Sequence, residues 1–166
     1  MDIGKDDAMM NSPGKNKELH DLLNTLLKES SARTVLLISK EGVCIDETGD
    51  TSYINTTALG ALVAGMFSAT REVARMVGED QFSILLQQGE KRHIHVSLLA
   101  QSFMMVVIFE DLQAIGRVRY ESNKVAEKVV HCLRRDPRDG GRDAEQLSVP
   151  DFREYALNLI DRIFHS

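Results

Sequence analysis

Several residue classes that mark particular kinds of protein are scarce in this chain of 166 residues. It has only two cysteines, Cys44 and Cys132, which are too few for a disulfide scaffold. It has no run of about 18 apolar residues, the length that a membrane span requires. Its first residues contain no apolar segment of the kind found in a secretory signal. We therefore expect a cytoplasmic protein without a membrane span.

Positive charge is also in short supply. The 20 Lys and Arg residues are outnumbered by 25 Asp and Glu residues, which leaves a formal net charge of -5. Binding to a nucleic acid needs clustered Lys and Arg side chains that displace the counterions of the phosphates. No such cluster is visible along the chain, so nucleic acid is not an expected partner.

The motifs of common enzyme classes are missing as well. The chain lacks the G-x-x-x-x-G-K-S/T, G-x-G-x-x-G and G-x-S-x-G patterns that hold phosphates, dinucleotides or a nucleophilic serine. His93 and His95 share one face of a predicted strand, but no third metal ligand stands at a matching spacing. We interpret this pair as part of a polar outward face and Cys44 as a small core residue. We predict no catalytic residues, no metal and no cofactor.

What the chain does have is an alternation of helical and strand patterns. Helical spacing of apolar residues begins at Lys17 and returns at 56–77 and 114–134, and strand patterns occupy 33–39, 43–47, 81–88, 92–99 and 103–109. The short links between neighbouring strands require antiparallel pairing. We predict an α/β (α+β) fold in the order α-β-β-α-β-β-β-α, with a five-stranded antiparallel sheet between one long helix and two helices. The most apolar strand, 103–109, should be central.

Polar segments divide the chain into four parts. Residues 1–16, broken by Pro13-Gly14, are expected to be an N-terminal tail, and residues 17–135 the folded domain. Residues 136–147, which contain D-P-R-D-G-G-R, have the composition of a linker. Residues 148–166 start with a helix signal and carry an apolar stripe, which predicts a C-terminal amphipathic helix that contacts a partner or a second protomer.

The long helix carries the most informative surface. Its largest apolar residues gather on one side, which we predict to be buried: Leu59, Leu62, Val63, Met66, Thr70, Val73 and Val77. Small residues lie off that stripe and would let a second helix approach closely. We therefore predict a dimer interface made by Gly60, Ala61, Ala64, Gly65 and Phe67. The alternative is close packing of this helix on its own sheet, at a cost of about 1 kcal/mol for each Gly against Ala.

The outward side of the same helix is low in bulk and mildly basic. Two such helices side by side would form a shallow platform, to which we assign partner binding by Thr57, Ala61, Ala64, Ser68, Arg71 and Arg75. The alternative is an ordinary solvated face. An Arg on a flat helix reaches poorly into a nucleotide pocket, so we interpret Arg71 and Arg75 as surface ion-pair residues and not as arginine fingers.

Three local segments resemble the Roadblock/LC7 family. They are N-T-T-A-L-G-A-L-V-A-G at 55–65, M-V-G-E-D-Q-F at 76–82, and V-V-I-F at 106–109 followed by I-G-R-V-R at 115–119. The likeness covers 17–133, and within the family it is strongest to bacterial proteins that regulate small Ras-like GTPases of cell polarity and gliding motility. The resemblance implies a non-catalytic homodimer that binds the GTP form of its partner and speeds hydrolysis.

Other functions stay open at this point. The protein could be a scaffold subunit of a multiprotein complex with no effect on hydrolysis, or its dimer could pair two different Roadblock chains. A small-molecule sensor is a third interpretation, although the expected core of Leu, Ile and Val lacks convergent polar groups.

Overall fold

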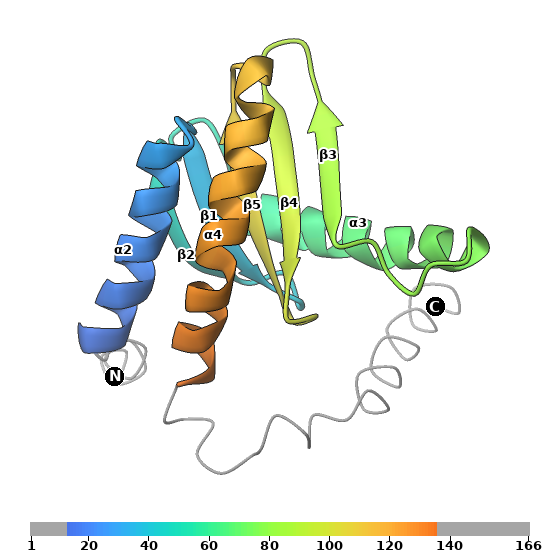
Figure 1. Ribbon diagram of the computed structural model, residues 1–166, viewed down its shortest axis with the longest axis horizontal. Helices are drawn as coiled ribbons and strands as arrows, with labels where there is room; N and C mark the ends of the chain where they lie inside the picture. The colour runs from blue at the N-terminus through green and yellow to red at the C-terminus, as the bar shows by residue number, and fades with distance from the viewer. Residues whose placement is uncertain (1–12, 136–166) are drawn as a thin grey trace, which may run out of the picture. The chain divides into compact units, whose positions relative to one another are not determined.

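The computed structural model describes residues 13–135, with side chains from Lys17 onward. The described elements follow the predicted order (Figure 1). They are α2 (Pro13–Glu29), β1 (Thr34–Ser39), β2 (Cys44–Gly49), α3 (Thr56–Met76), β3 (Ile84–Gln88), β4 (His93–Leu99), β5 (Phe103–Phe109), the 3-10 turn η1 (Leu112–Ala114) and α4 (Ile115–Arg134).

The five strands form one sheet in the order β2-β1-β5-β4-β3, and every neighbouring pair is antiparallel. β5 is central, as its apolar composition predicts, because Val106 pairs with Leu36 of β1 on one side and with Val96 of β4 on the other. The predicted α+β fold with a five-stranded antiparallel sheet is therefore confirmed.

Helices cover both faces of the sheet in different ways. α2 and α4 lie on one face and run along the strands, whereas α3 crosses behind the strands on the other face (Figure 1). Each face has its own buried cluster, one built around α2 and α4 and one around α3. Because side chains alternate along a strand, β1, β4 and β5 each supply residues to both clusters.

Element boundaries differ from the sequence-based ones at two places. α2 begins at Pro13, four residues before Lys17, so the Pro-Gly pair expected in the tail opens the helix instead. Proline fits there because its missing N–H would have had no partner in the first turn. β3 begins at Ile84 and not at Gln81, which leaves Phe82 in the loop after α3.

The prediction that His93 and His95 face outward is wrong. Both side chains are almost fully buried, at 3% and 1% exposed, on the side of β4 that α4 covers. His93 stacks at 5.3 Å between ring centroids on Phe109, which belongs to the cluster around α2 and α4. Alternation along β4 was correctly anticipated, but its polar side faces inward because α4 packs over it.

Some predictions lie outside the described residues: most of the N-terminal tail, the 136–147 linker and the 148–166 helix. Among the helices that are described, none is long and apolar enough to cross a membrane.

Candidate partner-binding surface

α3 is bounded by two capping arrangements that its sequence provides. Asn55 accepts a hydrogen bond from the backbone N–H of Ala58 at 3.1 Å, a side-chain cap of the first turn. At the other end Gly78 has φ +86°, its N–H donates to Arg75 O, and the N–H of Glu79 donates to Ala74 O. This pairing is a Schellman motif, which depends on the left-handed conformation that Gly adopts readily. The helix that carries the candidate surface therefore has well-defined ends.

The first turns of α3 press against the turn between β1 and β2. A Cβ built on Gly60 would lie 2.6 Å from the backbone oxygen of Gly42, and one built on Gly42 would lie 2.9 Å from the Cα of Ala61. No side chain fits between the two backbones at this distance. Gly60 is therefore needed for packing inside the protomer, and its place in the dimer interface stays a prediction.

This contact determines which side of α3 is buried. The buried residues are Gly60, Val63, Phe67 and Ala74, and Val63 and Phe67 pack with Ile38 and Met104 of the sheet. Phe67 is only 6% exposed, so most of its side chain already packs within the protomer, and its place in the dimer interface also stays a prediction. Sequence analysis placed the buried stripe on the side with the largest apolar residues, but the helix is rotated toward Gly60, where its backbone can approach most closely.

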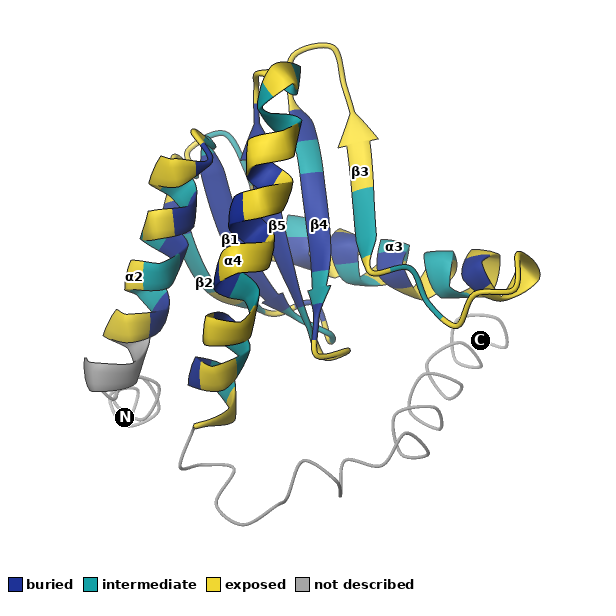
Figure 2. Ribbon diagram, viewed as in Figure 1, coloured by how far each residue is buried: buried dark blue, intermediate teal, exposed yellow. Residues whose placement is uncertain are grey.

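That rotation leaves an apolar flank of α3 exposed. Leu62, Val73, Met76 and Val77, which we call the apolar flank, are 71%, 51%, 86% and 66% exposed. The last turns of the helix extend past the β3 edge, where no strand is available to cover them (Figures 1 and 2). Clustered large apolar side chains on a protomer surface mark an interaction site. Sequence analysis missed this flank because the apolar stripe was read as core.

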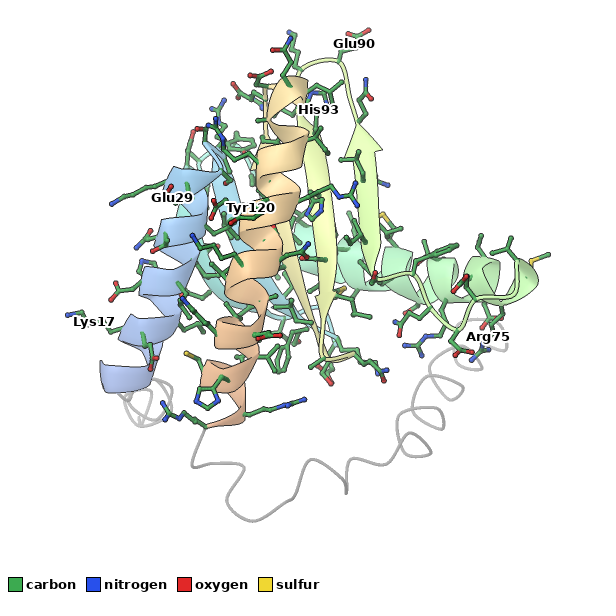
Figure 3. All side chains as sticks on the ribbon, viewed as in Figure 1. Lys17, Glu29, Arg75, Glu90, His93 and Tyr120 are labelled. Atoms are coloured by element: carbon green, nitrogen blue, oxygen red, sulfur yellow. The ribbon has the colours of Figure 1, made fainter. Side chains whose placement is uncertain are left out.

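The opposite flank of α3 consists of the small and basic residues predicted for partner binding, and we call it the small-residue flank. Its members are Thr57, Ala61, Ser68 and Arg75, all exposed, with Ala64 and Arg71 half-buried. Arg75 pairs with Glu72 at 3.0 Å, as an ion-pair residue would (Figure 3). The structure thus brings these six residues to one side of α3, next to Gly65, which is exposed and has nothing within 4 Å of a built Cβ.

Lys40, in the turn between β1 and β2, lies within the electrostatic reach of the small-residue flank. Partial burial and, after it, the positive charge of Arg71 lower the pKa of Lys40 to about 8. The basic character of the flank therefore extends beyond α3 itself. Sequence analysis did not include Lys40, because nothing in a one-dimensional pattern places this turn beside the helix.

β3 is a second feature next to α3 that sequence analysis did not assign. It forms one edge of the sheet, so one side of its backbone has no strand partner among the described strands. Gln87 Nε2 donates to the sulfur of Met66 on α3 at 3.0 Å, which joins this edge to the helix. Leu86, 46% exposed, pairs with His95 and faces the other side of the sheet.

The described residues offer little for catalysis. No group of three or more His, Cys, Asp or Glu converges anywhere in 13–135 in a way that could hold a metal ion. Cys44 is half-buried, and burial followed by the charge of Glu47 raises the pKa of its thiol to about 11. A thiol with so high a pKa stays protonated near neutral pH and is a weak nucleophile.

Comparisons with known proteins agree with this geometry. The Roadblock/LC7 domain model matches residues 18–109. The solved structure of MglB from Myxococcus xanthus is similar with a TM-score of 0.67 at 28% identity, over 70% of this chain and 94% of that one. A gliding protein MglB from Thermus thermophilus is similar with a TM-score of 0.67 at 24% identity, over 72% and 90% of the two chains.

More distant structures share the fold alone. A Roadblock/LC7 domain from Streptomyces avermitilis has a TM-score of 0.59 at 17% identity, over 70% of this chain and 98% of that one. A search of curated proteins finds no match. Because the family match extends over more than half of the 166 residues, the chain belongs to the Roadblock/LC7 family.

Proposed function

We propose that this protein is a dimeric, non-catalytic regulator that binds the GTP form of a small Ras-like GTPase through α3 and stimulates its hydrolysis, in cell polarity or motility. The observation that carries the proposal is the double surface of α3, with an apolar flank and a small-residue flank exposed on the same helix. The likeness to MglB, whose Thermus thermophilus form is a gliding protein, supports the motility setting.

The apolar flank fits a homodimer. Leu62, Val73 and Met76 are the kind of side chains that a second copy would remove from water, and burial of such a patch stabilises an isologous contact. Gly65, with open space around it, would let two copies of α3 approach closely. Of the residues predicted for the interface, Ala61, Ala64 and Gly65 stay in this proposal.

In such a dimer the small-residue flanks of both protomers would form one shallow platform. Ala61, Ala64 and Ser68 present little bulk, so a partner can approach the helix backbone closely. Lys40, Arg71 and Arg75 make the platform positive, which favours an acidic surface on the GTPase and steers its approach.

The proposed mode of stimulation needs no arginine finger. Arg75 is already paired with Glu72 and Arg71 is half-buried, so neither extends from the platform toward a nucleotide. A regulator without a finger can still act by holding the switch loops of the GTPase in their catalytic arrangement. Binding to the ordered GTP form would then precede the increase in hydrolysis rate.

A nucleotide-dependent pull-down tests the proposal. The purified protein is immobilised and exposed to its own cell lysate, one half loaded with a non-hydrolysable GTP analogue and the other with GDP. We expect mass spectrometry to identify a small Ras-like GTPase retained with the analogue only, and its hydrolysis rate to rise when the protein is added. Retention without a change in rate favours the scaffold function, and the absence of any GTPase in either half contradicts the proposal.

A further inference from the structure

A row of polar side chains lies beneath α4, on the opposite face of the sheet from α3. His93, His95 and Ser97 alternate along β4 and are 3%, 1% and 7% exposed; His93 is labelled in Figure 3. On β1 and β5 this layer is apolar, with Val35 and Leu37 from β1 and Met105, Val107 and Phe109 from β5. Polar residues return on β2, where the buried Thr48 donates to Asn24 of α2.

Hydrogen bonding does not explain the burial of this row. Within residues 17–135 no partner is found for Nδ1 of His93, for either ring nitrogen of His95, for Oγ of Ser97, or for Oγ of Ser122 on α4. A neutral imidazole has one donor and one acceptor. His95 therefore gains no protein hydrogen bond from its position beneath α4.

α4 supplies the residues that cover the row. Arg119 acts on His95 through its charge, and Ser122 lies one turn further along the same side of the helix. Ser97 on β4 and Ser122 on α4 are both buried, at 7% and 1% exposed, so both elements place polar groups in the interior.

We propose that this polar row is an acid-sensitive contact: uptake of a proton by His95 makes residues 115–126 of α4 open from β4 more often, while the strands of the sheet stay paired. β4 is hydrogen-bonded to β3 and β5 along its length, whereas α4 is held on the sheet by side chains. Val118 and Val125 of this segment belong to the same buried cluster as Val129 and Cys132 further along α4, so the opening is transient and the closed contact remains the main state.

The groups around His95 all oppose its protonation. Leu86 of β3 and Val107 of β5 pair with it and are apolar, His93 and Ser97 flank it on β4, and Arg119 faces it from α4. Glu121 lies about 200° around the helix from Arg119 and does not face His95. A buried imidazolium would thus lie within the electrostatic reach of the exposed Arg119, and none of these neighbours is a carboxylate that could neutralise it.

The direction of the effect follows from the pKa of His95. Burial, followed by the charge of Arg119, lowers this pKa below the ordinary value of 6.5. The detached state, in which the ring is hydrated, therefore binds more protons than the closed state. The closed contact is strongest above about pH 6.5, weakens as the pH falls below that value, and levels off below the folded-state pKa.

Hydrogen exchange of the full chain tests the inference. Exchange of residues 115–126 is compared between the wild type and His95→Gln at pH 7.5, 6.5 and 5.5, so that intrinsic exchange rates cancel at each pH. One proton taken up on opening predicts that the ratio of wild-type to variant opening grows by up to about tenfold per pH unit. Peptides from β1 and β5 should keep a constant ratio.

Two controls make the result decisive. His131→Gln removes an exposed His from the same helix and should behave as the wild type. If His95→Gln does not fold, the His95 ring resonance in wild-type protein labelled at histidine should titrate below 6.5, together with exchange of 115–126. A ratio that does not change with pH, a parallel change in β1 and β5, or a titration midpoint at or above 6.5 would overturn the proposal.

Discussion

The two faces of the sheet are covered by different arrangements of helices. On the α2 and α4 face, two helices run along the strands and close a cluster of 13 buried residues, and on the α3 face one crossing helix closes a cluster of 8. Large apolar residues remain exposed on α3, at Leu62, Val73 and Met76, whereas on α4 only Tyr120 is a large exposed apolar residue.

The α3 face therefore keeps exposed apolar surface for association with other chains, whereas the α2 and α4 face is covered within the protomer. A single helix that crosses the strands buries one side only, and its two flanks remain available to other chains. Two antiparallel helices pack together in one cluster with the sheet, so their exposed surfaces are mostly polar (Figure 1). The polar row of β4 shows that the completed face still contains a weak contact, and it lies away from the association surface.

The largest expected effect is the difference in protomer stability between a substitution on the buried side of α3 and one on its apolar flank. Phe67→Ala should lower the free energy of unfolding by about 3–5 kcal/mol, because it removes a buried aromatic ring and leaves a cavity. Leu62→Ala, at a residue 71% exposed, should change protomer stability by less than about 0.5 kcal/mol and weaken the dimer instead. Urea denaturation at low protein concentration and sedimentation at higher concentration measure the two quantities. Equal destabilisation by both changes would show that the apolar flank belongs to the core.

The second effect concerns the platform. The double variant Ala61→Arg and Ser68→Glu should weaken GTPase binding at least about a hundredfold, which corresponds to about 2.7 kcal/mol. Both positions are exposed, so the fold should be retained. The matched control, Asn123→Arg with Gln113→Glu, makes the same charge change at exposed positions on the other side of the sheet and should bind normally. Titration calorimetry measures the affinities for the GTPase, and sedimentation shows whether the variants remain dimers. Unchanged binding of the first variant would contradict the assignment of partner binding to the platform.

The third effect compares two glycines of α3 that differ only in their surroundings. Gly60→Ala forces a Cβ to within 2.6 Å of Gly42 O. The resulting strain, about 1–3 kcal/mol, should outweigh the gain of about 1 kcal/mol in helix propensity. Gly65→Ala meets no atom and should stabilise the protomer by up to about 1 kcal/mol while weakening the dimer. Thermal unfolding distinguishes them, and a stabilising Gly60→Ala would disprove the close contact.

The smallest expected effect concerns Arg33, whose ion pairs connect the loop before α3 with the segment before α4. Arg33 pairs with Asp50, in the loop that enters α3, at 3.0 Å, and also with Glu110, in the segment that leads to α4. Hydrogen bonds from Ser52, and then from Arg33, lower the pKa of Asp50 to about 2. The carboxylate therefore contributes stability above about pH 3.9, its unfolded value, and this contribution is lost as the pH falls toward 2. Asp50→Asn should reduce the acid sensitivity of Tm between pH 5 and pH 2.5, and an unchanged pH profile would argue against a role for this pair.

Individual residues show where sequence analysis succeeded and where it failed. The positions of Asn55 and Gly78 predicted both ends of α3 within one residue, because capping depends on local backbone geometry. Gly60 and Phe67 were placed off the buried stripe because a helical wheel shows which residues share a side, but not which side the sheet will contact. Lys40 could not be found at all, since it reaches the site from a distant turn.

The sequence by itself determined the order of the elements and the antiparallel sheet, because periodicity, capping residues and hairpin lengths act over a few neighbouring residues. Only the tertiary structure decided that α3 presses its Gly60 side on the sheet and exposes Leu62, and that α4 covers His95. Both outcomes depend on how closely and at what angle a helix meets the sheet, which is decided by contacts between residues far apart in the chain, such as Gly42 with Gly60.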